Sequence, residues 1–274
     1  MKNAKVGIAI FDATMEKEKV FGLLERKYAE FNCEQFIAND PVSIPHRFKR
    51  LQDVEISGFF AATLAWGNRK SILASCHRLL ELMDDAPFDF ITNHKETDLR
   101  PFLHFKHRTF NATDVLYFIA FFKEFYKQHH SLEEAFFVKG AVTTEESLRN
   151  FHPLFFSLND APQRTRKHVA NANKGSSCKR LNMFLRWMVR QDDNGVDLGC
   201  WKQLNASQLL MPLDVHVDRV ARVLGLIKRK QTDFQTVLEL TENLRDFDRT
   251  DPVKYDFALF GIGAAARGGG FDFK

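Results

Sequence analysis

Helical spacing of apolar residues along most of this 274-residue chain is the feature that most constrains its fold. Across Val54–Trp66 the apolar side chains fall on one stripe of a helix, and Asp53 precedes them as a candidate cap. Gly67 and Asn68 are typical turn residues, and the apolar spacing resumes over Ile72–Met83. The pattern predicts two helices joined by a tight corner at Gly67 and Asn68.

Two more helices are predicted from start signals in the middle of the chain. The segment Asn111-Ala-Thr-Asp opens a strong helical pattern that runs to Tyr126. Ser131-Leu-Glu-Glu134 has the sequence of a capping box, in which the serine and the last glutamate each bond a backbone N–H. The stretch Val138–Asn173 is polar and broken by prolines, which indicates a long irregular connection or an insertion rather than a second domain.

The last third of the chain carries three further helical patterns. They predict a helix that follows Gly175-Ser-Ser-Cys and ends near Arg190, a helix over Val215–Leu224, and a final helix from Asp251-Pro252 to Phe260 that is stopped by Gly261. The alternation typical of strands is scarce outside Val6–Phe11. The predicted fold class is therefore all-α.

The length of the chain suits one large domain or two small lobes with a cleft between them. We interpret residues 1–20 as an N-terminal extension, 21–263 as a helical domain that includes the irregular segment 138–173, and 264–274 as a flexible tail. The chain has 28 phenylalanines and only 4 tyrosines, which favours a core built from rings without hydroxyl groups.

No apolar run approaches the roughly 18–20 residues that a membrane-spanning helix needs. The run Val6–Phe11 is shorter than the core of a signal peptide, which has about 7–15 residues. We therefore expect a soluble cytoplasmic protein, associated with the nucleoid if its source is bacterial. The cysteines are dispersed and form no C-x-x-C pair, which is typical of reduced core residues; they are Cys33, Cys76, Cys178 and Cys200. We expect no metal and no cofactor.

The positive charge of the chain is concentrated in one segment, although the net charge is only +4. Residues 161–191 contain no Asp or Glu but carry Arg164, Arg166, Lys167, Lys174, Lys179, Arg180, Arg186 and Arg190. A second basic cluster contains Arg219, Arg222, Lys228, Arg229 and Lys230. Such concentration on an otherwise acidic chain indicates a polyanionic partner such as nucleic acid. The alternative is a solvated basic face without a partner.

Lys179 and Asp214 are the residues best placed for chemistry. If Ser176 or Ser177 caps the helix that follows, Lys179 lies near its first turn, where the helix dipole and the neighbouring cations favour the neutral, nucleophilic amine. The alternative role of Lys179 is a phosphate contact. Asp214 stands at the predicted N-cap of the Val215 helix, where a carboxylate stays ionised. It either caps the helix only, or also stabilises developing positive charge and activates a nucleophile.

Several segments together resemble the helix-hairpin-helix DNA glycosylases and abasic-site lyases. Lys179-Arg-Leu-Asn-Met-Phe-Leu185 resembles the helix after their hairpin, which begins with a nucleophilic lysine. Pro212–Val220 is similar to their (V/L)-D-(T/V)-H-x-x-R-V block, whose aspartate is essential, and Asp53–Arg69 and Asp251–Gly263 resemble their early and last helices. The whole sequence resembles an uncharacterised bacterial group that is placed beside this superfamily.

This resemblance implies an all-α, two-lobed helix-hairpin-helix fold with a cleft between the lobes, and a monomer that binds double-stranded DNA carrying a damaged base or an abasic site. It implies that Lys179 is the amine nucleophile and Asp214 the activating carboxylate. The expected base pocket contains Trp66 and Trp187. The expected nucleic-acid contacts are Asn68, Arg69, Lys174, Gly175, Ser176, Ser177, Arg180, Asn182, Arg186, His216 and Arg219.

The sequence also departs from the family pattern. The hairpin Asn173–Cys178 has one glycine and no proline where L-P-G-V-G is usual, and the interval between Lys179 and Asp214 is wider than in the endonuclease III branch. The C-terminal four-cysteine motif is absent, so no iron–sulfur cluster is expected. Two other functions stay open at this point: a non-catalytic DNA- or RNA-binding protein that retains the fold, and an interaction scaffold for an acidic protein.

Overall fold

A computed structural model describes residues 17–265, which form helices and one short β-hairpin. The α-helices are α1 (Lys17–Phe31), α2 (Glu34–Ile37), α3 (Leu51–Leu64), α4 (Arg69–Glu81), α5 (Pro87–Asn93), α6 (Ala112–Tyr126), α7 (Glu145–Phe155), α8 (Lys179–Val189), α9 (Val215–Val223), α10 (Phe234–Arg245) and α11 (Tyr255–Ala265). The all-α class is therefore confirmed. Val6–Phe11 and positions 266–274 of the predicted tail lie outside the described residues.

Short 3-10 helices connect the longer elements. They are η1 (Pro41–Ser43), η2 (Pro45–Arg47), η3 (Glu96–His104), η4 (Leu132–Ala135), η5 (Gln163–His168), η6 (Ala172–Lys174), η7 (Ala206–Gln208) and η8 (Pro252–Lys254). The hairpin pairs β1 (Lys106–His107) antiparallel with β2 (Phe110–Asn111). None of the described helices combines the length and the apolar character that are needed to cross a bilayer.

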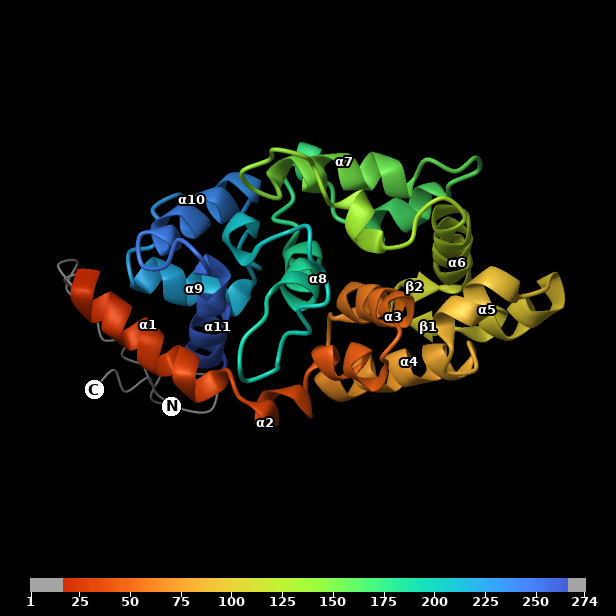
Figure 1. Cartoon of the computed structure of the whole chain (residues 1–274), viewed down its shortest axis with the longest axis horizontal. Coiled ribbons are helices and arrows are strands. Elements are labelled where there is room, and N and C mark those ends of the chain that lie inside the picture. The colour runs from red at the N-terminus through yellow and green to blue at the C-terminus, as the bar shows by residue number, and fades with distance from the viewer. Residues whose placement is uncertain (1–16, 266–274) are drawn as a thin grey trace, which may run out of the picture.

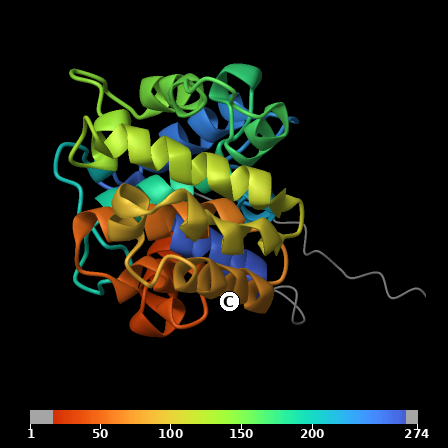
Figure 2. The same ribbon diagram turned by 90° about the vertical axis from the view of Figure 1, so that its right-hand side faces the viewer.

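Helix α8 lies between two groups of helices (Figure 1). One group, drawn on the left, contains α1, α9, α10 and α11, and within it α11 packs against both α1 and α9. The other group contains α3 to α7, and α8 packs against α3 of this group. Figure 2 looks at this second group from its outer side and shows α6 running across it. Residues from both groups of helices can therefore meet beside α8 and contribute to one site.

Phenylalanine rings form the centre of the α3–α7 group, as the composition predicts. Phe59 of α3 is 1% exposed, and its ring centroid lies 5.5 Å from that of Phe122 and 5.6 Å from that of Phe155. The ring of Phe184 packs edge-on against Phe59 at 5.4 Å, so α8 is joined to this core by an aromatic contact. Offset and edge-on ring contacts of this kind stabilise the core beyond what the burial of apolar area contributes.

The predicted corner between two helices is confirmed, but the cap of the first helix was predicted wrongly. Gly67 has a φ of +112°, and the Asn68 side chain caps α4 by accepting a hydrogen bond from the Ser71 N–H at 3.3 Å. Helix α3 begins at Leu51, so Asp53 lies inside its first turn instead of before it. Its carboxylate accepts a hydrogen bond of 2.8 Å from the Phe88 N–H, at the start of α5.

Three other segments differ from their predicted structure. The segment 138–173 is not irregular throughout, because it contains α7, which tolerates Pro153. The capping box at Ser131 is present, but it opens only the short helix η4. Gly261 does not stop the last helix, which continues to Ala265. At Gly261 and Gly263 a Cβ would collide with Phe31 of α1 and His216 of α9, so these glycines permit close packing of α11.

Candidate functional site

Lys179 is the first residue of α8, as the sequence predicts, but the cap of this helix is different from the predicted one. Cys178 is the N-cap, with a left-handed φ of +51°, and its side chain makes no capping hydrogen bond. Ser176 and Ser177 precede the cap, and the hydroxyl of Ser176 accepts a hydrogen bond from the Cys178 N–H at 3.3 Å. This turn directs the chain into α8 immediately before the lysine.

Asp214 is the N-cap of α9, as predicted. Its Oδ1 accepts hydrogen bonds from the backbone N–H groups of His216 at 2.8 Å and Val217 at 2.9 Å. Its Oδ2 lies 3.8 Å from Nζ of Lys179. The two side chains are 18% and 30% exposed, respectively. One carboxylate oxygen therefore holds the helix terminus, and the other faces the amine.

Asn182 ties together the segments that carry these two residues. Its Nδ2 donates to the backbone oxygens of Ser177 at 3.2 Å and Met211 at 3.4 Å. Ser177 precedes the lysine and Met211 precedes the aspartate, so the amide of Asn182 fixes both chain segments. The side chain is fully buried, which corrects the prediction that Asn182 contacts nucleic acid.

Lys179 and Asp214 line a cavity of about 320 Å³ whose walls come from α2, the α3–α4 corner, α8, α9 and α11. Its aromatic lining residues are Phe36, Trp66, Trp187, Phe257 and Phe260. Both tryptophans that were predicted for a base pocket therefore border the cavity, although Trp187 is fully buried. Among the described residues neither indole N–H has a hydrogen-bond partner.

Three carboxylates of the cavity wall each face a cation. Lys179 is 3.8 Å from Asp214, and Nη2 of Arg69 is 3.5 Å from Oδ2 of Asp40. Nη1 of Arg186 bonds Oδ2 of Asp256. In residues 17–265 no group of three or more His, Cys, Asp and Glu side chains is arranged to hold a metal ion. The cavity therefore offers one amine and two guanidinium groups, each paired with a carboxylate, in an aromatic surrounding.

Burial raises the pKa of two of these carboxyls. For Asp40 the loss of solvation outweighs the hydrogen bond from the Val42 N–H and the charge of Arg69. For Asp256 burial raises the pKa to about 7, even though the positive charge of Arg186 opposes the shift. Neither residue was among the site residues predicted from the sequence. Asp256 is the one acidic residue inside the apolar pattern of the last helix, and this feature of the sequence could have identified it.

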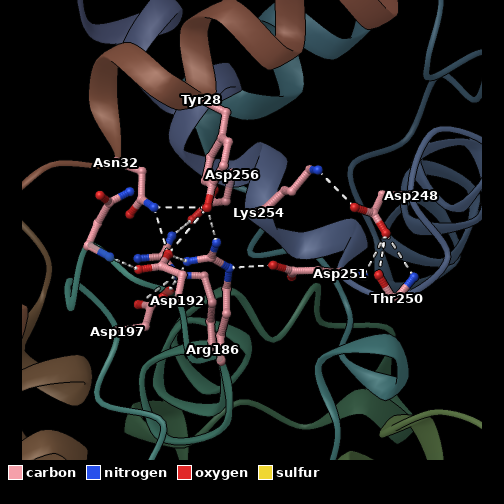
Figure 3. A network of polar contacts seen from close by, with 12 residues as sticks. Tyr28, Asn32, Arg186, Asp192, Asp197, Asp248, Thr250, Asp251, Lys254 and Asp256 are labelled. Atoms are coloured by element: carbon pink, nitrogen blue, oxygen red, sulfur yellow. Dashed lines mark hydrogen bonds and ion pairs between the residues drawn. The ribbon is translucent and has the colours of Figure 1, made fainter.

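The two arginines at the end of the basic segment lie inside the protein and not on its surface. Arg186 is 3% exposed, and its Nε lies 3.2 Å from Oδ1 of Asp197. Arg190 is 1% exposed and lies 3.1 Å from Asp197 and 2.8 Å from Asp251. Figure 3 shows this network, with Arg186 close to Asp197 and Asp256. The prediction that Arg186 contacts nucleic acid is therefore corrected, because its guanidinium is used in buried ion pairs.

Further residues predicted to contact nucleic acid serve other purposes in the structure. A guanidinium N–H of Arg180 donates to the backbone oxygen of Thr63, and Arg219 donates to the backbone oxygen of Gly263 at 2.7 Å.

Arg69 reaches the cavity, with its guanidinium 5.9 Å from the centroid of the Phe260 ring. His216 also lines the cavity, so Arg69 and His216 are brought together with the candidate catalytic pair.

The hairpin residues Lys174 and Ser176 line a second concavity, of about 630 Å³, outside the cavity. Arg166 and Lys167 of η5 and His152 of α7 line it too, and none of its lining residues within 17–265 is acidic. Burial and the charge of Arg166 lower the pKa of His152. Gly175, with a φ of +79°, lies exposed between the two hairpin residues. We call this concavity the basic groove.

The family model described as protein of unknown function (DUF2400) matches residues 40–265. The chain belongs to this family. The part that matches the DUF2400 model includes every residue that lines the cavity except Phe36, and it includes the whole basic groove. No curated protein and no solved structure matches the chain.

Proposed function

We propose that this protein is a DNA glycosylase with abasic-site lyase activity, of the kind that acts in base-excision repair. The observation that carries the proposal is the approach of the Lys179 amine to the free Oδ2 of Asp214, at 3.8 Å, inside an aromatic-lined cavity. An amine paired with a carboxylate is the arrangement required to attack a sugar carbon and form a Schiff base. In this proposal the two groups of helices on either side of α8 are the two lobes, and the cavity is the cleft between them.

In the proposed mechanism Asp214 has two simultaneous functions. Its Oδ1 accepts two backbone N–H groups of α9, which fixes the carboxylate so that its Oδ2 faces the amine. Its Oδ2 takes a proton from Lys179, and the neutral amine attacks C1′ of the damaged nucleotide while the base leaves. The C1′–O4′ bond then breaks, O4′ takes a proton and the lysine nitrogen forms a Schiff base with C1′. Loss of a proton from C2′ eliminates the 3′-phosphate, which nicks the strand. Until it takes that proton from Lys179, the carboxylate also stabilises positive charge that develops on the sugar.

The cavity walls support binding of a base that is turned out of the duplex. The cavity has a volume of about 320 Å³, and Trp66, which is only partly buried, supplies ring surface on which a base can stack. Asn68 and Arg69 stand at the corner between α3 and α4, where they can fill the gap that the base leaves. Such a gap-filling contact stabilises the distorted duplex.

The basic groove supports binding of the flanking phosphates. Lys174, Lys167 and Arg166 line it without an acidic neighbour, and electrostatic contacts of this kind supply most non-specific affinity for DNA. The groove reaches Ser176, which is separated from Lys179 by only two residues, so its phosphates would be close to the reacting nucleotide. A non-catalytic DNA or RNA binder would use the same groove but would not need the Lys179–Asp214 pair.

The proposal is tested by borohydride trapping on duplex DNA with a single abasic site. Wild-type protein is expected to form a covalent adduct, because borohydride reduces the Schiff base between Lys179 and the sugar. Lys179→Gln is expected to lose the adduct while it still binds the duplex. Lys230→Gln is the matched control, because Lys230 is an exposed lysine outside both the cavity and the groove.

Each outcome decides between an enzyme and a binding protein. An adduct that survives in Lys179→Gln would show that another amine is the nucleophile. Wild-type protein that is folded and binds the duplex but gives no adduct would overturn the lyase proposal and favour the non-catalytic binder.

A further inference from the structure

Asp256 is the most deeply buried carboxyl of the cavity. It lies in the first turn of α11, lines the cavity, and is 7% exposed. Figure 3 shows it beside Arg186, whose Nη1 bonds its Oδ2. The chemistry described above uses Lys179 and Asp214 and gives no task to this acid.

Asp256 belongs to a buried cluster in which carboxyls outnumber cations. Asp214 faces Lys179 and Asp40 faces Arg69. Arg186, the partner of Asp256, is shared with the buried Asp197, which also contacts Arg190 at 3.1 Å. The negative charge of Asp214 acts on Asp256 as well. The guanidiniums of Arg186 and Arg190 together therefore serve four carboxyls, those of Asp192, Asp197, Asp251 and Asp256, which favours a proton on one of them.

The other two acids of the cavity are held by partners of their own. Asp214 accepts two backbone N–H groups and faces an ammonium. Asp40 accepts the Val42 N–H at 3.1 Å and faces Arg69. Burial raises the pKa of Asp256 to about 7, although Arg186 and Lys179 oppose the shift. The raised pKa favours the protonated form of Asp256 near neutral pH.

We propose that Asp256 is the general acid that protonates the departing base. This proposal rests on the glycosylase activity proposed above and deepens it. Lys179, as a neutral amine, forms a bond to C1′, and the glycosidic C–N bond breaks with its electron pair going to the base. The proton of Asp256 moves to that base, which leaves as a neutral molecule, and Asp256 becomes a carboxylate opposite Arg186. The class of substrate is a base that leaves slowly unless it is protonated.

The test compares base removal with attack on a site that has already lost its base. Asp256→Asn is assayed on duplexes that each carry one uracil, hypoxanthine or 8-oxoguanine, and on a duplex with an abasic site. Base removal by the variant is expected to fall by about 100-fold or more, the usual contribution of a general acid. Trapping on the abasic site should stay near the wild-type level, because no base departs there.

The pH profile supplies a readout that a structural role would not change. Base removal by the wild type is expected to decline as the pH rises through about 7, because Asp256 loses its proton. Asp256→Asn is expected to lack this decline. The matched control is Asp197→Asn, which also removes a carboxyl from Arg186 but does not line the cavity. Provided that it is folded at the assay temperature, it should keep the decline but show it at a lower pH, because Arg186 is then left to Asp256 and a negative charge that raises the pKa of Asp256 is removed.

The possible failures are distinguishable. Equal base removal by Asp256→Asn and wild type, or the same decline with pH in both, would overturn the role of Asp256 alone. Equal losses of base removal and of abasic-site trapping would assign Asp256 to the integrity of the site and not to acid catalysis. Wild-type protein that is trapped on the abasic site but removes none of the three bases would overturn the glycosylase proposal, and the acid with it, while the lyase stands.

Discussion

At the scale of single residues, Asp214 shows how a structural and a chemical role can share one side chain. Its Oδ1 accepts the first free N–H groups of α9, and its Oδ2 faces Lys179. The sequence left open whether this aspartate is only a cap. The geometry makes the two roles separable by substitution, because asparagine keeps a capping oxygen but carries no charge.

We expect Asp214→Asn and Asp214→Ala to differ in stability but not in chemistry. Asparagine is as good a cap as aspartate, so Asp214→Asn should change the free energy of unfolding by less than about 0.5 kcal/mol. Alanine removes the cap, and Asp214→Ala should lower it by about 1 kcal/mol. Both variants should lose abasic-site trapping. Chemical denaturation and trapping measure the two effects, and an active Asp214→Asn would reduce the residue to a cap.

At the scale of elements, α11 positions the site through two close contacts. A Cβ at Gly263 would lie 2.7 Å from Cβ of His216 and 3.0 Å from its backbone oxygen. His216 is two residues after Asp214, so this contact holds the first turn of α9 against α11. Gly261, which the sequence suggested as a helix stop, and Gly263 therefore serve packing between helices.

Gly263→Ala is expected to destabilise the protein and to disturb the site. The added methyl group meets backbone atoms of α9 that cannot rotate away, so we expect a loss of about 1–3 kcal/mol in the free energy of unfolding. Trapping should fall as well, because α9 carries Asp214. The matched control is Gly22→Ala in α1, whose new Cβ would have its nearest neighbour, Nη1 of Arg26, at 3.7 Å.

Gly22→Ala should raise stability by about 0.5–1 kcal/mol, because alanine loses less conformational entropy than glycine in a helix. Thermal or chemical unfolding of both variants measures the difference. A Gly263→Ala protein as stable as the wild type would contradict the tight contact between α9 and α11.

At the scale of the whole molecule, the fold divides the basic segment into interior and surface parts. Arg186 and Arg190 are buried in ion pairs, whereas Lys167 and Lys174 are exposed along the basic groove. Lys179, which stands between these two pairs in the sequence, lines the cavity. Only part of the positive charge is therefore available to a polyanion.

The double variant Lys167→Glu/Lys174→Glu is expected to weaken binding to any DNA duplex. If each lysine contacts one phosphate, the slope of log affinity against log salt concentration should decrease in size by about 2. Fluorescence anisotropy over a range of salt concentrations measures the slope, with Lys230→Glu as the control outside the groove. An unchanged slope would exclude the groove from the duplex interface.

The sequence by itself determined the helical class, the α3–α4 corner, the cap at Asp214 and the position of Lys179 at a helix start. These features depend on local spacing and on hydrogen bonds between near neighbours, which the order of residues records directly. Only the tertiary structure decided which residues surround the cavity. Asp40, Asp256 and Phe260 come from distant segments, and their approach depends on how helices pack.

The same reason explains the errors. A cluster of cations in the sequence does not reveal which side chains turn inward, and Arg186 and Asn182 are buried because acids and carbonyls from other segments meet them there. Glycine is typical of a helix end, yet Gly261 and Gly263 lie within α11, at the points where α1 and α9 approach too closely for a Cβ. Local preference sets where helices are favoured, and packing between them decides which side chains meet.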